Sequence, residues 1–194
     1  ILKNTSYNYA RFGGLFGTTN NATISNINFT HANISESHDL GVVVGACSYS
    51  NISNCHVLSS VVKVVGAFVG GISGSITGSY VSNCSVSNSI ITGGVCIGGI
   101  IGSDVEYDRV STVTNCSVSN SVITGTGEEV AGIVGQNISA HIYNCSVEST
   151  NIEGYFDVAG ITGHVFGDYG EVDILNSYVK NSTMRTTGYS TADN

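Results

Sequence analysis

The chain has 194 residues, enough for one domain with a sizeable core and too few for two comfortable ones. Six Lys+Arg against fourteen Asp+Glu give a formal net charge of −8, which disfavours binding to a nucleic-acid backbone. Only 10% of the residues are charged, yet no apolar run is long enough for a membrane-spanning helix. The many Ser, Thr, Asn, Gly, Val and Ile residues favour strands and turns over helices.

A repeat of about thirty residues covers most of the chain. Each copy begins with an apolar segment flanked by small residues, at 13–17, 41–45, 66–70, 98–102, 131–135 and 159–163. Each copy then carries an asparagine in a common context, at Asn26, Asn54, Asn83, Asn115, Asn144 and Asn176. The last glycine of the segment lies nine residues before this asparagine in three copies and thirteen in the others. The difference predicts a four-residue loop insertion.

Apolar and polar residues alternate around the asparagine. Two residues before it stand Ile24, Ile52, Val81, Val113, Ile142 and Ile174, and three after it stand Phe29, Val57, Val86, Val118, Val147 and Val179. A further apolar column follows at Ile34, Val62, Ile91, Ile123, Ile152 and Met184. Such alternation is typical of strands with one buried face.

These strand-like pieces predict an all-β protein. A unit with three strands suits one coil of a parallel β-solenoid (β-helix), in which no coil buries its apolar residues without its neighbours. We expect residues 1–194 to form a single solenoid domain of about six coils, with roughly 30 residues per coil. The absence of proline fits, because interior strands need every N–H group for pairing.

The segments Gly13–Gly17 and Ile52–Cys55, with their repeats, resemble the GLUG motif, a glycine-flanked apolar segment followed by an Ile-Ser-Asn-Cys-like strand. The resemblance covers roughly residues 11 to 184. GLUG repeats occur in bacterial surface proteins, including adhesin-like proteins and IgA-peptidase precursors, and the resemblance implies a similar setting here. The His-Glu-x-x-His motif of metallopeptidases is not in the sequence.

The asparagine column is predicted to form turns. Asparagine tolerates the left-handed backbone conformation, and stacked side-chain amides can form hydrogen bonds from coil to coil. The next column holds Ile27, Cys55, Cys84, Cys116, Cys145 and Ser177. Because isoleucine is accepted there, we interpret these cysteines as reduced thiols packed in the core. Disulfides between adjacent coils are the alternative; a metal site is disfavoured because a linear ladder does not converge tetrahedrally.

The glycine-flanked segment has two adjacent apolar columns. One contains Leu15, Val43, Phe68, Ile100, Ile133 and Ile161, and the other contains Phe16, Val44, Val69, Ile101, Val134 and Thr162. A third column, Phe12, Leu40, Val65, Ile97, Val130 and Val158, is assigned to the second face. Neighbours in a strand point to opposite faces. Either a bent or covered coil buries both faces, or one face is an apolar stripe that docks a partner.

The polar residues define no catalytic set. The histidines His31, His38, His56, His141 and His164 fall in different columns, and no Ser/His/Asp or Cys/His constellation emerges. Carboxylates cluster at Asp104, Glu106 and Asp108, and again at Asp168, Glu171 and Asp173. Oxygen ligands of this kind can hold calcium, but neither loop has a known calcium signature, so solvated loops are favoured. We expect no catalytic, metal or cofactor site.

Asn-x-Ser/Thr triplets are frequent. Those outside the turn column are candidate N-glycosylation sites in a glycosylating secretory pathway: Asn4, Asn21, Asn28, Asn33, Asn51, Asn137 and Asn181. The triplets at Asn83, Asn115 and Asn144 arise from the repeat itself.

We expect a non-enzymatic extracellular or cell-surface segment that acts as a stalk, spacer or adhesive surface. Open solenoid ends favour flanking coils or head-to-tail or lateral self-association. A chain that starts at Ile1 fits a mature or excised piece of a larger protein. The alternative is a carbohydrate-active or carbohydrate-binding β-helix, with Asp104, Asp108 and Arg109 as the candidate active residues. Passive binding of a glycan or host protein would use tyrosines such as Tyr107, Tyr155 and Tyr169.

Overall fold

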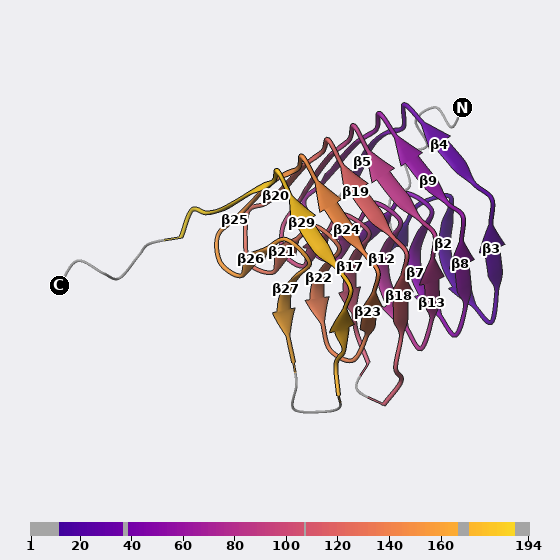
Figure 1. The fold of residues 1–194 in the computed structure, drawn as a ribbon. Helices are drawn as coiled ribbons and strands as arrows, with labels where there is room; N and C mark the ends of the chain where they lie inside the picture. Colours follow the sequence, from indigo (N-terminus) through magenta and orange to yellow (C-terminus); the bar gives the residue numbers. More distant parts are fainter. Residues whose placement is uncertain (1–11, 37–38, 107, 167–170, 189–194) are drawn as a thin grey trace.

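The computed structural model describes residues 12–36, 39–106, 108–166 and 171–188, and these residues contain strands and turns but no helix. The chain winds as a parallel β-solenoid of about six coils with about 29 residues per turn (Figure 1). The prediction of an all-β solenoid is confirmed. Each coil contains five short strands, where the sequence suggested three, because tight turns break the predicted pieces.

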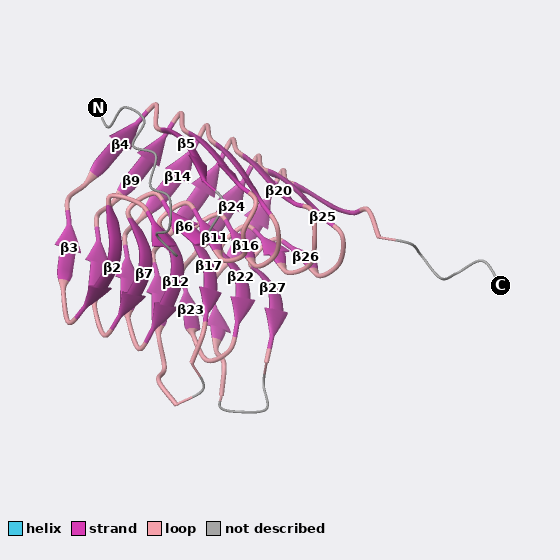
Figure 2. Ribbon diagram, turned by 180° about the vertical axis from the view of Figure 1, so that it is seen from behind, coloured by secondary structure: helices cyan, strands magenta, loops and turns pink. Residues whose placement is uncertain are grey.

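Equivalent strands of the six coils pair in parallel to form five sheets, numbered here in their order along a coil. Sheet 1 contains β1 (Phe12–Gly13), β6 (Asp39–Gly41), β11 (Val69–Gly70), β16 (Ile97–Gly98), β21 (Val130–Ala131) and β26 (Val158–Ala159). Sheet 2 contains β2 (Phe16–Asn20), β7 (Val44–Ser48), β12 (Ser73–Thr77), β17 (Ile101–Asp104), β22 (Val134–Asn137) and β27 (Thr162–Val165). Figure 2 shows the strands of sheet 2 side by side along the stack.

The asparagine region supplies the next two sheets. Sheet 3 contains β3 (Thr23–Ser25), β8 (Asn51–Ser53), β13 (Tyr80–Ser82), β18 (Thr112–Thr114), β23 (His141–Tyr143) and β28 (Ile174–Leu175). Sheet 4 contains β4 (Asn28–Thr30), β9 (His56–Leu58), β14 (Ser85–Ser87), β19 (Ser117–Ser119), β24 (Ser146–Glu148) and β29 (Tyr178–Lys180).

Sheet 5 contains β5 (Asn33–Glu36), β10 (Val61–Val64), β15 (Ile90–Gly93), β20 (Val122–Gly125), β25 (Asn151–Gly154) and β30 (Thr183–Thr186). Coil 1 therefore runs from β1 to β5, and coil 6 runs from β26 to β30.

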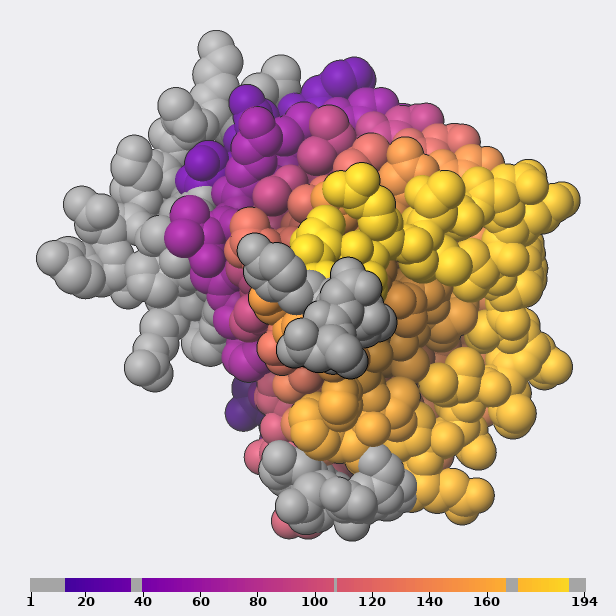
Figure 3. Space-filling view, turned by 90° about the vertical axis from the view of Figure 1, so that its left-hand side faces the viewer, coloured from indigo at the N-terminus to yellow at the C-terminus, as the bar shows by residue number. Residues whose placement is uncertain are grey.

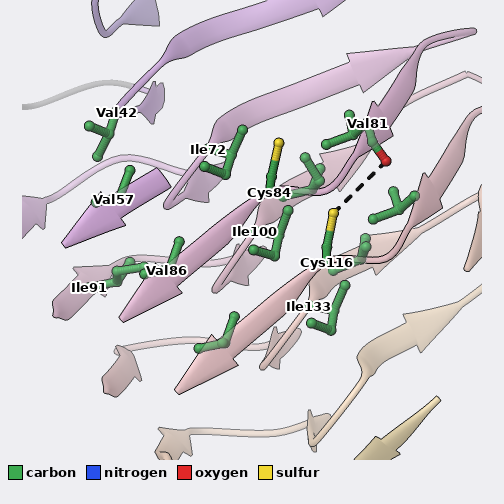
Figure 4. Close-up of a cluster of buried hydrophobic side chains, with 14 of the residues drawn as sticks. Val42, Val57, Ile72, Val81, Cys84, Val86, Ile91, Ile100, Cys116 and Ile133 are labelled. Carbon is green, nitrogen blue, oxygen red and sulfur yellow. Dashed lines mark hydrogen bonds between the residues drawn. The ribbon is translucent and has the colours of Figure 1, made fainter. Parts of the chain in front are cut away.

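The register places like residues above one another. In sheet 4, for example, Val86 pairs with both Val57 and Val118. These apolar columns meet inside the solenoid, where Ile72, Ile100 and Ile133 lie near Val86 and the cysteine column (Figure 4). The core residues of coils 2 to 5 are almost completely buried, because each has a coil above and below it.

The third copy differs from the sequence alignment. Ser73 pairs with Val44 and Ile101, so the glycine-flanked segment of this coil is 70–74 instead of 66–70. Val65, expected in an apolar column, is 84% exposed, and Val69 takes that place opposite Leu40 and Ile97. The sequence contains two overlapping Gly-x-x-x-Gly patterns, at 66–70 and 70–74, and both fit the repeat. In the structure the second is the correct one, and its Ile72 is buried in the core.

Two other features differ from the alignment of the repeat copies that the sequence suggested. The four-residue insertion belongs to coils 4 and 6 alone, which have the longer steps of 32 residues between asparagines. Phe12 pairs with Asp39, one position away from its expected column.

Both adjacent apolar columns of the glycine-flanked segment are buried in the middle of the stack. Ile100 and Ile101 are each 0% exposed, as are Ile133 and Val134. The segment before sheet 1 packs closely here: a Cβ on Gly102 would lie 2.5 Å from the Val69 nitrogen and 2.6 Å from the Phe68 carbonyl carbon. The bent or covered coil is therefore correct, and these columns form no docking stripe.

Candidate functional site

Each coil turns at residues with a left-handed backbone. All six asparagines of the predicted turn column have φ between +51° and +59°. A second such column, not predicted from the sequence, lies five residues later at His31, Ser59, Asn88, Asn120, Ser149 and Asn181. A third turn uses Asn21, Tyr49 and Gly78. We call the residue directly after each left-handed residue at these three turns a slot.

The slots form hydrogen-bonded ladders inside the turns. Ser89 Oγ donates to the Ser87 carbonyl oxygen (2.8 Å) and accepts from the backbone N–H of Ser60 in the preceding coil (3.1 Å). Ser79 makes the same two bonds, to Thr77 (2.8 Å) and from Ser50 (3.2 Å). Each serine in a slot thus satisfies two backbone groups that would otherwise be buried without partners.

The cysteine column occupies the middle slot. Cys84 Sγ donates to the Ser82 carbonyl oxygen, and Cys116 Sγ to that of Thr114, both at 3.3 Å. In coil 6 the slot residue is Ser177, whose hydroxyl accepts from the Cys145 N–H (3.1 Å). A thiol serves here in place of a serine hydroxyl because this slot faces the apolar interior, beside Ile100 (Figure 4).

Cys55, Cys84, Cys116 and Cys145 are free thiols that are at most 1% exposed. Hydrogen bonds to Cys145 and Cys84, followed by burial, raise the pKa of Cys116, so this group is a neutral thiol at pH 7. Cys47 and Cys96 are also buried and not in disulfides. The column has the geometry of packed, reduced thiols.

The turn asparagines have a backbone conformation in common, and contacts between their side-chain amides are a minor feature. Asn54 Nδ2 donates to Asn26 Oδ1 at 3.5 Å, a long contact between exposed side chains. All six side chains of the column are exposed. Their common property is the positive φ, which asparagine tolerates better than most residues.

A shallow pocket of about 650 Å³ lies over the first three strands of sheet 2. Its lining is mostly small and polar: Thr18, Thr19, Asn20, Ala46, Cys47, Ser48, Tyr49, Ser75, Thr77 and Val105. The Arg109 guanidinium, from the loop inserted in coil 4, lies 5.8 Å from the centre of the Tyr49 ring. Gly78 permits this arrangement, because a Cβ there would lie 3.1 Å from the ring. A flat aromatic ring beside hydroxyls is a surface that can bind a sugar or a peptide.

A polar network continues along the stack from sheet 2. Gln136 accepts from Ser103 Oγ at 2.8 Å and donates to both carboxylate oxygens of Glu129, at 3.0 and 3.1 Å. Cys96 Sγ lies 2.8 Å from Glu129 Oε2, and in the next coil His164 lies 3.1 Å from Asp157. The network ties sheet 2 to the segment before sheet 1, which is a structural use of these groups.

The three carboxylates of the first acidic cluster, Asp104, Glu106 and Asp108, differ in burial. Asp104 is 0% exposed and accepts from Ser111 Oγ (2.8 Å), Ser139 N (2.8 Å) and Ser139 Oγ (2.9 Å). Burial raises the pKa of this carboxyl group, although the hydrogen bonds oppose the shift. Glu106 and Asp108 are exposed. Asp104 therefore anchors the inserted loop and cannot reach a bound substrate.

In the second cluster Glu171 is exposed, Asp173 accepts from the Tyr143 hydroxyl at 3.1 Å, and Asp168 lies outside the described residues. Within the described ranges, no group of three His, Cys, Asp or Glu side chains could hold a metal ion. Among the histidines, His56 contacts Ser85 and His141 lies 3.8 Å from Asp173, while His38 is not described.

The candidate glycosylation sites include both exposed and buried asparagines. Asn21, Asn28, Asn33, Asn51 and Asn181 are exposed, and Asn4 lies outside the described residues. Asn137 is 0% exposed, and its amide bonds to the backbone N–H and carbonyl oxygen of Ala140 at 2.8 and 3.0 Å. The folded chain has no room for a glycan there.

Of the tyrosines considered for ligand binding, Tyr155 is half-buried against Phe156. Tyr107 and Tyr169 lie outside the described residues. Tyr49, which the sequence did not single out, is the tyrosine that borders the pocket.

Comparison of the chain with family models, with curated proteins and with solved structures gives no match. The described residues contain no helix that is long and apolar enough to cross a membrane.

Proposed function

We propose that the chain is a non-enzymatic structural repeat segment of an extracellular or cell-surface protein, serving as a stalk, spacer or adhesive surface. The observation that carries this proposal is the continuity of the ladders: five parallel sheets run through all six coils. Such a stack is stiff, because each of coils 2 to 5 is held by backbone hydrogen bonds and core contacts to both neighbours. The motif-level resemblance to GLUG repeats supports the surface location.

The fate of the candidate chemical groups supports the same proposal. The cysteine column is buried and engaged in backbone hydrogen bonds. Asp104, one of three residues considered for a carbohydrate-active site, is enclosed by Ser111 and Ser139. The cysteine column and Asp104 therefore have structural partners.

Antibodies raised against the folded chain test the location. On intact cells of the source organism we expect surface labelling, lost when the gene is deleted; labelling only after lysis would contradict the proposal. Adhesion of the deletion strain to host or abiotic surfaces then separates the two roles. A loss of adhesion supports an adhesive surface, whereas unchanged adhesion supports a spacer.

The pocket over sheet 2 favours a second candidate, passive glycan binding. Tyr49 is 44% exposed and the Arg109 guanidinium lies over its ring, so the exposed part of the ring and the guanidinium can contact one ligand. A glycan array probed with the chain and with Tyr49→Ala tests this. Tyr80→Ala is the matched control, because Tyr80 is equally exposed, at 44%, on sheet 3. Binding lost only in Tyr49→Ala supports the candidate, and no binding or equal loss in both variants excludes it.

A further inference from the structure

The slot ladders have a direction. Wherever the slot of the later coil holds a serine, its hydroxyl accepts from the slot N–H of the earlier coil. Ser50 Oγ accepts from Ala22 N (2.9 Å), and Ser60 Oγ accepts from Ala32 N (3.1 Å). At the other end of the stack, Ser182 Oγ accepts from Thr150 N (3.1 Å). A coil can follow another only if it brings acceptors at its own slots.

The two ends of the described stack, coil 1 and coil 6, differ in the acceptors that their slots carry. The slots of coil 1 hold Ala22, Ile27 and Ala32, none of which has a side-chain acceptor. In coil 6 the slots include Ser177 and Ser182, whose side chains already serve coil 5. Because the equivalent N–H groups of Cys145 and Thr150 in coil 5 donate toward the following coil, those of Ser177 and Ser182 are directed to the side of coil 6 where no described coil lies. Coil 1 therefore lacks the groups that the outer side of coil 6 requires.

The apolar columns show the same asymmetry. In coil 6, Ile174, Val179 and Met184 are 39%, 37% and 47% exposed. The residue of coil 1 that is equivalent to Ile174 is Ile24, which is only 5% exposed, and Phe29 and Ile34 are half-buried. Figure 3 views the stack from the coil 6 end, with the yellow residues of this coil toward the viewer. An uncovered core lies at one end of the described stack.

We propose that the outer side of coil 6 is a docking surface for a further parallel β coil that carries Ser, Thr or Cys at the two slots that lie over Ser177 and Ser182. The coil 1 end of a second copy is not this occupant, because its slots would leave the Ser177 and Ser182 N–H groups buried without acceptors. The occupant also places apolar residues over Ile174, Val179 and Met184. This inference rests on the fold and is independent of the proposed function.

An added coil tests the proposal. Residues 65–93 form one coil, with slots Ser79, Cys84 and Ser89, and Thr186 pairs with Gly154 in the register that leads into such a coil. A chain with 65–93 joined after Thr186, in place of 187–194, is compared with a control. In the control the added copy alone carries the coil 1 residues, through Ser79→Ala, Cys84→Ile and Ser89→Ala.

Hydrogen exchange of the Ser177 and Ser182 amides is the readout. We expect exchange roughly tenfold slower with the Ser/Cys/Ser coil than with the control coil, the change given by one hydrogen bond per amide. Equal protection in both chains would overturn the role of the slots, and no protection in either would overturn the docking surface. The unmodified chain supplies a second measurement by sedimentation velocity. We expect no head-to-tail polymers, and linear, concentration-dependent polymers would refute the proposed mismatch of the ends.

Discussion

Replacement of one slot serine measures how much the ladders stabilise the fold. Ser89→Ala removes the bond to the Ser87 carbonyl oxygen and the bond from the Ser60 N–H, and Ser89 is only 2% exposed. At about 1 kcal/mol for each lost bond, the free energy of unfolding should fall by about 2 kcal/mol. Ser89→Thr should change it by less than about 0.5 kcal/mol, because Thr150 occupies the equivalent slot and its hydroxyl donates to the Glu148 carbonyl oxygen as Ser89 Oγ donates to that of Ser87.

Urea unfolding followed by circular dichroism gives these free energies. Ser87→Ala is the matched control: its side chain points outward two residues away, so we expect a change within about 0.5 kcal/mol. The Ser60 amide should also exchange faster in Ser89→Ala than in the control. If Ser89→Ala were as stable as Ser87→Ala, the slots would not be the stabilising ladders described above.

Three other expectations follow from single features. Because burial raises the pKa of Asp104, the charged carboxylate destabilises the folded state. The unfolding free energy of the chain, compared with that of Asp104→Asn, should therefore fall as the pH rises above about 3.8. A difference between the two that is independent of pH would contradict this. Asn115 has φ +51°, so Asn115→Ala should cost about 1 kcal/mol in thermal unfolding and Asn115→Gly should cost less, whereas equal melting temperatures would argue against left-handed strain. The six buried thiols should react with a thiol reagent only after unfolding, and thiols missing from the unfolded count would indicate the disulfide alternative.

The fold could be predicted from the sequence because each coil repeats the same physical requirements. An apolar residue two before and three after the asparagine marks a strand in every copy, and the parallel register keeps those residues aligned. The second turn column was missed because His31, Ser59 and Asn88 have little in common as residue types. The slot after it carries a clear signal, since Ser, Thr or Ala lies six residues after every repeat asparagine.

The remaining features depend on contacts that no local pattern specifies. The correct third segment, 70–74, could be distinguished from 66–70 only through burial of Ile72 in the assembled core. Asp104 and Ser139 lie 35 residues apart and meet because a loop inserted in coil 4 folds against coil 5. Tyr49 and Arg109 likewise come from different coils. Such sites require the register first, and the register is a property of the whole stack.

Engineered disulfides test the parallel, in-register stack most directly. Ser85 and Ser117 pair across adjacent coils in sheet 4, where strands lie about 4.8 Å apart, within the range that a disulfide spans. The pair Ser85→Cys and Ser117→Cys should therefore oxidise readily, whereas Ser85→Cys with Ser119→Cys, displaced by two residues along the strand, should not. Rapid oxidation of the displaced pair, or of neither pair, would contradict the stacking of coils in this register.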